Sequence, residues 1–184
     1  MRYLTLANQL TILRILLIPV FVLLLVYDQL GAAFATFVAA GLTDALDGLA
    51  ARRAGERTTL GAWLDPAADK LLAVTSFVTL TLPMLPLTNR IPVWLTILVI
   101  SRDVVIVAVV AIVNLAVGPR TFRPSFWGKC ATAAYIVLVV VVMFFNWQRQ
   151  QSVIVDLAIA LALALTLVSA GDYLVRLRRL VNEN

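Results

Sequence analysis

The stretch DALDGLAARRAGERTTLGAWLDPAADK, residues 44–70, places four aspartates within two strongly apolar segments. They are Asp44, Asp47, Asp65 and Asp69. A carboxylate at the centre of a membrane helix costs about 2.5–3.5 kcal/mol, and four unpaired ones would cost on the order of 10 kcal/mol. We therefore expect positive charge to lie among these aspartates.

The spacing of the aspartates indicates where they meet. If both segments are helices, Asp44 and Asp47 share one face, and Asp65 and Asp69 share another. The polar link of residues 52–58 makes the two helices antiparallel, so we expect the four carboxylates to converge at similar depth below one membrane surface. Such oxygen ligands suit Mg²⁺, Mn²⁺ or Ca²⁺. Four of them can hold two divalent ions, an arrangement that stabilises phosphoryl displacement.

Small residues accompany the acids. Gly48, Ala50, Ala51 and Gly61 remove side chains from the helix faces near the carboxylates, which lets a bulky ligand approach the backbone. Small residues also let membrane helices pack closely, and this alternative stays open. Arg52 follows Gly48 by one turn, where it can neutralise a diphosphate.

At these residues the chain resembles a known family. The pattern D-x-x-D-G-x-x-A-R, eight residues, then G-x-x-x-D-x-x-x-D is similar to the signature of the CDP-alcohol phosphatidyltransferases. Every fixed position is met, at Asp44, Asp47, Gly48, Ala51, Arg52, Gly61, Asp65 and Asp69. The alternative is a set of buried aspartates merely paired with Arg52, Arg53 and Lys70.

The resemblance implies a donor, a metal site and a base. The donor would be CDP-diacylglycerol, with CMP leaving, and two Mg²⁺ or Mn²⁺ ions would bridge the diphosphate. The implied metal ligands are Asp44, Asp47, Asp65 and Asp69, with Asp69 also the general base for the acceptor hydroxyl. The implied nucleotide-binding residues are Asp44, Gly48, Ala51, Arg52 and Gly61.

Composition identifies the chain as a membrane protein. Of its 184 residues, 62% are hydrophobic, and the mean hydropathy is +0.97, far above a soluble domain. We expect an all-α integral membrane protein and a single domain over residues 1–184. The net charge of +5 is better explained by cytosolic loops and anionic lipid than by nucleic acid. Histidine is absent, which removes the usual general base.

Six spans are expected, over residues 10–27, 31–52, 59–80, 90–117, 125–146 and 152–175. The first is read as a retained span rather than a cleaved signal, with Thr11 as its cap and Arg14 either snorkelling to the surface or reaching the site. Eleven basic residues fall on the side of both termini and two on the other. Both termini and the aspartates are therefore expected to face the cytoplasm, in a bacterial inner or plasma membrane.

Four basic residues are candidates for binding the phosphate of the acceptor, namely Arg102, Arg120, Arg123 and Lys129. Arg120 and Arg123 are equally well explained as basic residues of a cytoplasmic loop. Arg102 stands in the middle of a span beside Asp103. We do not expect a simple Arg102–Asp103 pair, because neighbouring side chains on a helix point apart.

Further stretches narrow the resemblance. AGLTDALDG, DPAADK, IPVWLTILVISRDV and RPSFWGK look like the eukaryotic-type cardiolipin synthases of this family, whose acceptor is phosphatidylglycerol. The related phosphatidylglycerophosphate synthases use glycerol 3-phosphate and usually carry two further cations, where this chain has uncharged residues at 105–110 and 130–131. A dianion needs such cations more than a phosphodiester does. Phosphatidylglycerol is therefore the expected acceptor, and glycerol 3-phosphate is the alternative.

A non-enzyme function is also weighed. Acids inside a membrane mark ion or proton pathways as well as active sites. Transporters, however, tend to repeat their charged positions between two halves, whereas here the acids are clustered and no second half repeats them. The resemblance finally implies a homodimer formed through membrane helices.

Overall fold

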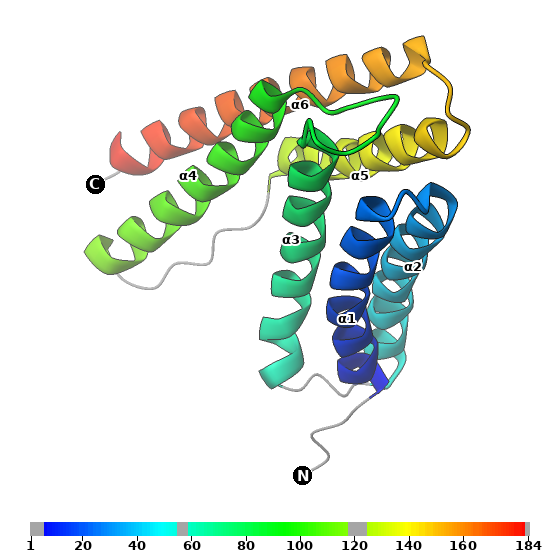
Figure 1. The fold of residues 1–184 in the computed structure, drawn as a ribbon. Coiled ribbons are helices and arrows are strands. Elements are labelled where there is room, and N and C mark those ends of the chain that lie inside the picture. The colour runs from blue at the N-terminus through cyan, green and yellow to red at the C-terminus, as the bar shows by residue number, and fades with distance from the viewer. Residues whose placement is uncertain (1–5, 55–58, 118–124, 183–184) are drawn as a thin grey trace. The chain divides into compact units, whose positions relative to one another are not determined.

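The computed structural model describes residues 6–54, 59–117 and 125–182. Side chains are described for most of this range, but not for residues 6–7, 44–54, 59–63, 110, 113–114, 116–117 and 177–182. The described chain folds into helices, drawn in Figure 1, and the expected all-α class is confirmed. The helices are α1 (Leu6–Val26), α2 (Leu30–Ala54), α3 (Thr59–Thr81), α4 (Val93–Val117), α5 (Phe126–Trp147) and α6 (Val153–Asn182).

The helix bounds follow the expected spans closely, with three differences. Helix α1 begins at Leu6, so Thr11 lies inside the helix and does not cap it. Helix α4 begins only at Val93, because Pro92 precedes it and its carbonyl accepts from Leu95 and Thr96. Helix α6 continues seven residues past position 175, since the basic residues beyond the apolar run are good helix formers.

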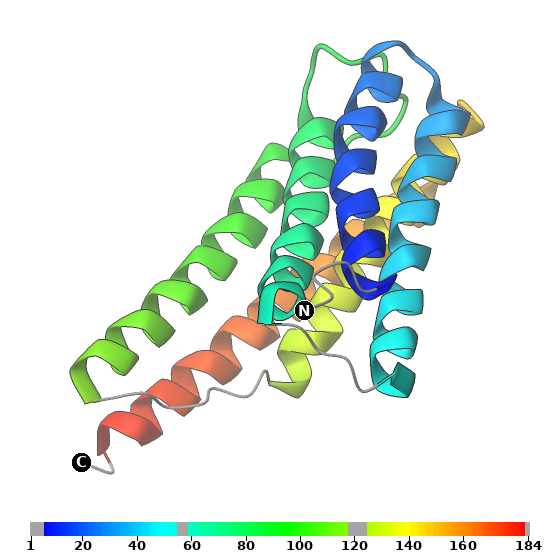
Figure 2. The ribbon, with the colours of Figure 1, turned by 90° about the horizontal axis from the view of Figure 1, so that it is seen from below.

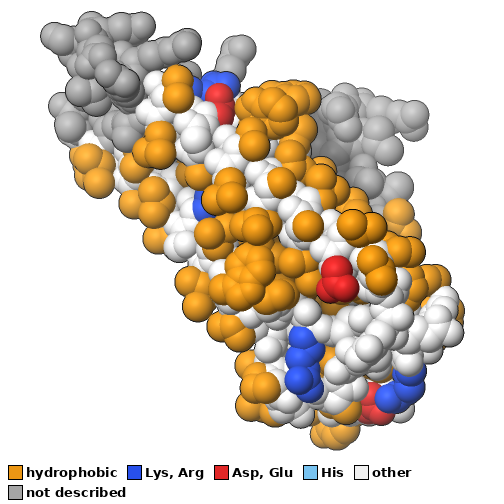
Figure 3. All heavy atoms as spheres, turned by 90° about the horizontal axis from the view of Figure 1, so that it is seen from above, with side chains coloured by type: hydrophobic (Ala, Val, Ile, Leu, Met, Phe, Trp, Pro, Cys, Tyr) orange, Lys and Arg blue, Asp and Glu red, His pale blue; other side chains and the backbone are white. Residues whose placement is uncertain are grey.

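Within the described residues, three helices are long and apolar enough to cross a membrane, judged by length and composition. These spans are Asn8–Val26, Phe126–Trp147 and Val153–Arg176, and Leu30–Thr43 is a shorter apolar helix. Large apolar side chains such as Leu16, Ile97 and Leu161 are exposed. On the face drawn in Figure 3, apolar side chains predominate over the few charged ones. These features support an integral membrane protein.

The chain divides into two compact units, and each is described by itself. The first comprises Met1–Arg90 and Val142–Gln151, and the second comprises Ile91–Val141 and Ser152–Asn184. In the first unit, α1 packs against both α2 and α3, and Figures 1 and 2 show α1 between the other two helices. Its core includes Phe21 and Phe37, whose ring centroids are 5.8 Å apart. Helix α1 therefore contacts both helices of the aspartate motif.

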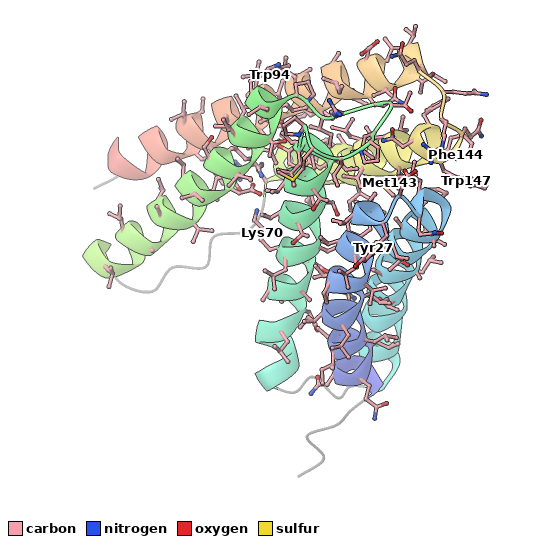
Figure 4. All side chains as sticks on the ribbon, viewed as in Figure 1. Tyr27, Lys70, Trp94, Met143, Phe144 and Trp147 are labelled. Atoms are coloured by element: carbon pink, nitrogen blue, oxygen red, sulfur yellow. The ribbon has the colours of Figure 1, made fainter. Side chains whose placement is uncertain are left out.

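The turn between α1 and α2 is tied to the end of α5 within the first unit. Asp28 and Arg149 both have positive φ angles, 59° and 53°, and their side chains form an ion pair of 2.5 Å. Trp147 stacks on Phe34, with ring centroids 6.0 Å apart, and Figure 4 shows Trp147 beside this turn. A Cβ on Gly31 would lie 2.8 Å from Nε1 of Trp147, so the close packing requires glycine at this position.

Two buried asparagines join the loop after α3 to the end of α5. The backbone N–H of Asn89 donates to Oδ1 of Asn146 at 2.8 Å, and Nδ2 of Asn146 donates back to the Asn89 carbonyl at 2.9 Å. Nδ2 of Asn89 donates to the carbonyl of Gln150 at 2.7 Å. We call this arrangement the asparagine clamp. It gives hydrogen-bond partners to loop backbone that is otherwise shielded from water.

In the second unit, α4 packs against α6. The hydroxyls of Tyr135 on α5 and Thr166 on α6 share a buried hydrogen bond of 2.7 Å. Leu138 and Ala162 are fully buried in the same unit. These contacts hold α4, α6 and the first part of α5 around Arg102, described below.

Candidate active site

The predicted site residues fall partly inside and partly outside the described side chains. Asp44, Asp47, Gly48, Ala51 and Arg52 lie on the C-terminal part of α2, whose backbone is helical as expected. Gly61 lies in the first turn of α3. The side chains of these residues lie outside the described part, as do Arg120 and Arg123 entirely. Their roles stay predictions.

The other two aspartates of the motif lie one turn apart on α3 and face α1. The hydroxyl of Thr11 donates to Oδ1 of Asp65 at 2.5 Å. Nη1 of Arg14 donates to Oδ1 of Asp69 in an ion pair. Of the two positions expected for Arg14, the structure has the one that reaches the site. A cation therefore lies beside the acids, as expected for carboxylates within an apolar helix.

Burial is unequal across this contact. The side chain of Arg14 is 0% exposed, whereas that of Asp69 is 49% exposed. Thr11 is also fully buried, and Asp65 is half-buried. Ala68, between the two acids, is fully buried, and a small residue here lets α1 and α3 approach closely. The carboxylates thus contact α1 on one side, and Asp69 keeps a large exposed surface.

The donor chemistry at this position fits a hard divalent cation. Asp65 and Asp69 offer carboxylate oxygens one turn apart on α3, and the motif places Asp44 and Asp47 at i,i+3 on α2. Among the described side chains, which include two of these four aspartates, no group of three or more possible ligands occurs. The residues that would hold a metal are the four aspartates predicted from the sequence.

A second cluster of polar groups surrounds Arg102 in the second unit. Nη1 of Arg102 donates to Asp103 at 2.7 Å, and Nη2 donates to the hydroxyl of Ser169 at 2.5 Å. The guanidinium also lies over the ring of Tyr173, 5.7 Å from its centroid. Its Nε is buried and has no partner within the part of the chain that the structure describes. We call Arg102, Asp103, Ser169 and Tyr173 the arginine cluster.

The Arg102–Asp103 ion pair corrects the sequence prediction, in which such a pair was not expected. The Cβ atoms of neighbouring helix residues do point apart, but an arginine side chain is long enough to fold back onto the next residue. The two side chains are 10% and 15% exposed. An unpaired charge is costly in a buried position, so Arg102 pairs with the nearest carboxylate even though the geometry is not ideal.

The start of α5 lies against the arginine cluster. The hydroxyl of Ser125 accepts the backbone N–H of Gly128 at 2.9 Å and so caps the helix. A Cβ on Gly128 would lie 3.3 Å from Nη2 of Arg102 and 3.6 Å from the ring of Tyr173. Lys129, the next residue, is exposed. The structure therefore brings Arg102 close to the backbone that carries Lys129, two of the four residues predicted to bind the acceptor.

Sequence reasoning missed the partners of these residues. Ser169 and Tyr173 form a polar i,i+4 pair on the otherwise apolar helix α6, and this spacing was a usable signal. Thr11 and Arg14 form a similar i,i+3 pair on α1, but nothing in the sequence indicated which acid each of them contacts.

Comparison with known proteins gives a family and several relatives. The model of the CDP-alcohol phosphatidyltransferase family matches residues 4–168. A human cardiolipin synthase (CMP-forming) is 38% identical over 151 residues, covering 73% of this chain and 48% of the relative. A probable phosphatidylglycerophosphate synthase of Mycobacterium tuberculosis is 37% identical, covering 69% of this chain and 59% of the relative. A CDP-diacylglycerol–glycerol-3-phosphate 3-phosphatidyltransferase of Haemophilus influenzae is 36% identical, covering 70% and 69%. The chain thus spans about half the length of the human relative.

Proposed function

The chain belongs to the CDP-alcohol phosphatidyltransferase family, and on this basis we propose that it is a membrane phospholipid synthase. It transfers a phosphatidyl group from CDP-diacylglycerol to an alcohol and releases CMP. The observation that carries the proposal is the pair Asp65 and Asp69, aligned on one face of α3 and contacted by Thr11 and Arg14 of α1. Two acids in an apolar helix, each with a specific polar partner, are typical of a functional site.

The proposed chemistry assigns a role to each residue of the motif. The acceptor hydroxyl oxygen attacks the phosphorus that carries diacylglycerol, and the bond from that phosphorus to the CMP oxygen breaks. Asp69 takes the hydroxyl proton. Asp44, Asp47 and Asp65, with Asp69, would hold two Mg²⁺ or Mn²⁺ ions. When bound, these ions offset the negative charge that develops on the diphosphate. The groups that would line the nucleotide are Asp44, Gly48, Ala51, Arg52 and Gly61.

The proposed acceptor is phosphatidylglycerol, and the product is cardiolipin. Arg102, Lys129, Arg120 and Arg123 would bind the acceptor phosphate. Because Arg102 already pairs with Asp103, its charge is partly offset, which suits the single charge of a phosphodiester better than a dianion. The alternative acceptor is glycerol 3-phosphate, because relatives of similar identity carry either name.

The proposed topology extends the three candidate spans to six. Both termini and the four aspartates lie on the cytoplasmic side of a bacterial inner or plasma membrane, since most basic residues fall on that side. Residues 1–184 act as one domain, and two copies form a homodimer through membrane helices.

An acceptor assay tests the function. Purified protein in detergent receives CDP-diacylglycerol with Mg²⁺ or Mn²⁺, and either phosphatidylglycerol or glycerol 3-phosphate, while CMP and lipid product are followed. Cardiolipin made from phosphatidylglycerol is the expected result. Turnover with glycerol 3-phosphate alone would establish the alternative acceptor. If no alcohol yields CMP, with or without metal, the enzyme function is wrong and an ion or proton pathway becomes the better reading.

The general base is tested by Asp69→Asn. Asparagine keeps an oxygen that accepts from Arg14 but cannot take a proton at neutral pH. We expect CMP release to fall by about 10²–10⁴-fold, while binding of CDP-diacylglycerol is retained. An Asp69→Asn protein with normal turnover would remove the base assignment and leave the family reaction intact.

A further inference from the structure

Two buried polar side chains of helix α1 contact the carboxylates of α3. The proposed chemistry assigns no role to either of them. Thr11 and Arg14 are three residues apart on α1, and Asp65 and Asp69 are four residues apart on α3. Both spacings place the pair on one face of its helix. The two pairs meet in register, Thr11 on Asp65 and Arg14 on Asp69.

The unequal burial of Arg14 and Asp69 distinguishes their contact from ordinary helix packing. Arg14 is completely buried while its partner Asp69 is half exposed. An arginine with no partner in the interior can keep its apolar stem buried and extend its guanidinium to the membrane surface. Arg14 instead contacts one oxygen of the carboxylate from the buried side of the α1–α3 interface. Asp69 is thus fixed on one side and accessible on the other.

Thr11 imposes a similar constraint on Asp65. Its hydroxyl, 0% exposed, donates to Oδ1 of Asp65 at 2.5 Å. A hydrogen bond to a charged acceptor is roughly twice as strong as one between neutral groups, so it selects one rotamer of the aspartate. Groups behind a metal-binding carboxylate that orient it in this way change metal affinity without touching the metal.

We propose that Thr11 and Arg14 are positioning residues that set the geometry of Asp65 and Asp69 for metal binding and catalysis. This inference rests on the proposed function, because it takes Asp65 as a metal ligand and Asp69 as the base. Both side chains are fully buried, so we expect neither to touch the substrate. They fix α3 carboxylates from α1, so the site is built from three helices rather than from the two that carry the motif.

The first measurement needs no turnover. Mn²⁺ is titrated into the purified protein in detergent without nucleotide, and free Mn²⁺ is followed by electron paramagnetic resonance. Thr11→Val keeps the shape but loses the donor, and we expect Mn²⁺ affinity to fall about tenfold. Thr11→Ser keeps the hydroxyl and should bind within about threefold of the wild type. The matched control is Thr36→Val, whose hydroxyl bonds only to the Ala32 carbonyl of its own helix among the contacts described.

The second measurement is kinetic. Arg14→Gln and Arg14→Lys are expected to lower kcat by about a hundredfold, because a displacement of about 1 Å at a reacting group has that effect. The KM for CDP-diacylglycerol should stay near the wild-type value. The control is Arg149→Gln, which breaks the exposed ion pair to Asp28 in the same unit and should leave kcat unchanged.

The outcomes are distinguishable. The positioning proposal is overturned if Thr11→Val binds Mn²⁺ as tightly as the wild type and the Arg14 variants have a normal kcat. If the Arg14 variants fail to fold, as judged by size-exclusion chromatography, the Thr11→Val and Thr11→Ser pair decides the question. If the wild type binds Mn²⁺ but never releases CMP, the proposed function is wrong, and the titration still decides whether Thr11 orients a metal-binding carboxylate.

Discussion

Removing the hydroxyl of Ser169 tests whether the arginine cluster serves the acceptor. In Ser169→Ala, Nη2 of Arg102 loses its 2.5 Å hydrogen bond to α6. Arg102 is only 10% exposed, so water is a poor replacement. A hydrogen bond to a charged group contributes about 1.5–3 kcal/mol, and part of this is recovered by rearrangement against Asp103 and Tyr173.

We therefore expect the free energy that stabilises Arg102 in its present position to decrease by about 1.5 kcal/mol. If Arg102 binds the acceptor phosphate, this loss corresponds to an increase of about tenfold in the KM for the acceptor. The KM for CDP-diacylglycerol should not change, because the residues proposed to bind this substrate lie on α2 and α3. The melting temperature should fall by a few degrees, since about 1 kcal/mol shifts it by about 2–4 °C in a domain of this size.

The assay measures initial rates of CMP release while each substrate is varied in turn, with thermal unfolding of the same samples. Ser101→Ala is the control, because Ser101 neighbours Arg102 in sequence but is exposed, and its hydroxyl bonds to the Leu98 carbonyl of its own helix. A lower melting temperature with an unchanged acceptor KM would refute the reasoning and leave the cluster a structural role. A raised KM for CDP-diacylglycerol alone would assign the cluster to the donor.

Two further predictions concern the first unit. Gly31→Ala places a Cβ 2.8 Å from Nε1 of Trp147 and should lower the unfolding free energy by about 1 kcal/mol despite its better helix propensity. Gly41→Ala, with no described atom within 4 Å, should raise it, and equal effects in thermal unfolding would contradict this prediction. Asn146→Ala removes both partners of the Asn89 backbone and should destabilise by about 2–5 kcal/mol; a melting temperature within 2 °C of wild type, on the scale of about 2–4 °C per kcal/mol, would count against the asparagine clamp.

The helices were predictable because their signal is local. Apolar runs of membrane length, ended by Pro, Gly and polar clusters, placed most helix ends to within a few residues. The errors fall where the ends depend on context, as at Pro92 and at the end of α6, which continues seven residues past position 175. The aspartate motif was also local, since Asp65 and Asp69 are fixed by spacing on one helix. Side chains such as that of Asp44 lie outside the described part, so their convergence stays a prediction.

The contacts between helices could not be predicted in the same way. Thr11 meets Asp65 across 54 positions of sequence, and such a pairing depends on the rotation and axial shift of α1 against α3, to which no local pattern is sensitive. The wrong prediction for Arg102 has a different origin. It used the direction of Cβ atoms, which decides contacts for short side chains but not for arginine.

The asparagine clamp has a consequence for the order of synthesis. Residues 1–90 emerge from the ribosome first, but the unit they build also contains residues 142–151. Asn89 therefore finds its partners on Asn146 and Gln150 only after some sixty more residues have been made. Helices α1, α2 and α3, two of which carry the aspartates, would enter the membrane with this loop still open. We expect a nascent chain ending before α5 to be an early target for membrane quality-control proteases, and the complete chain to escape them.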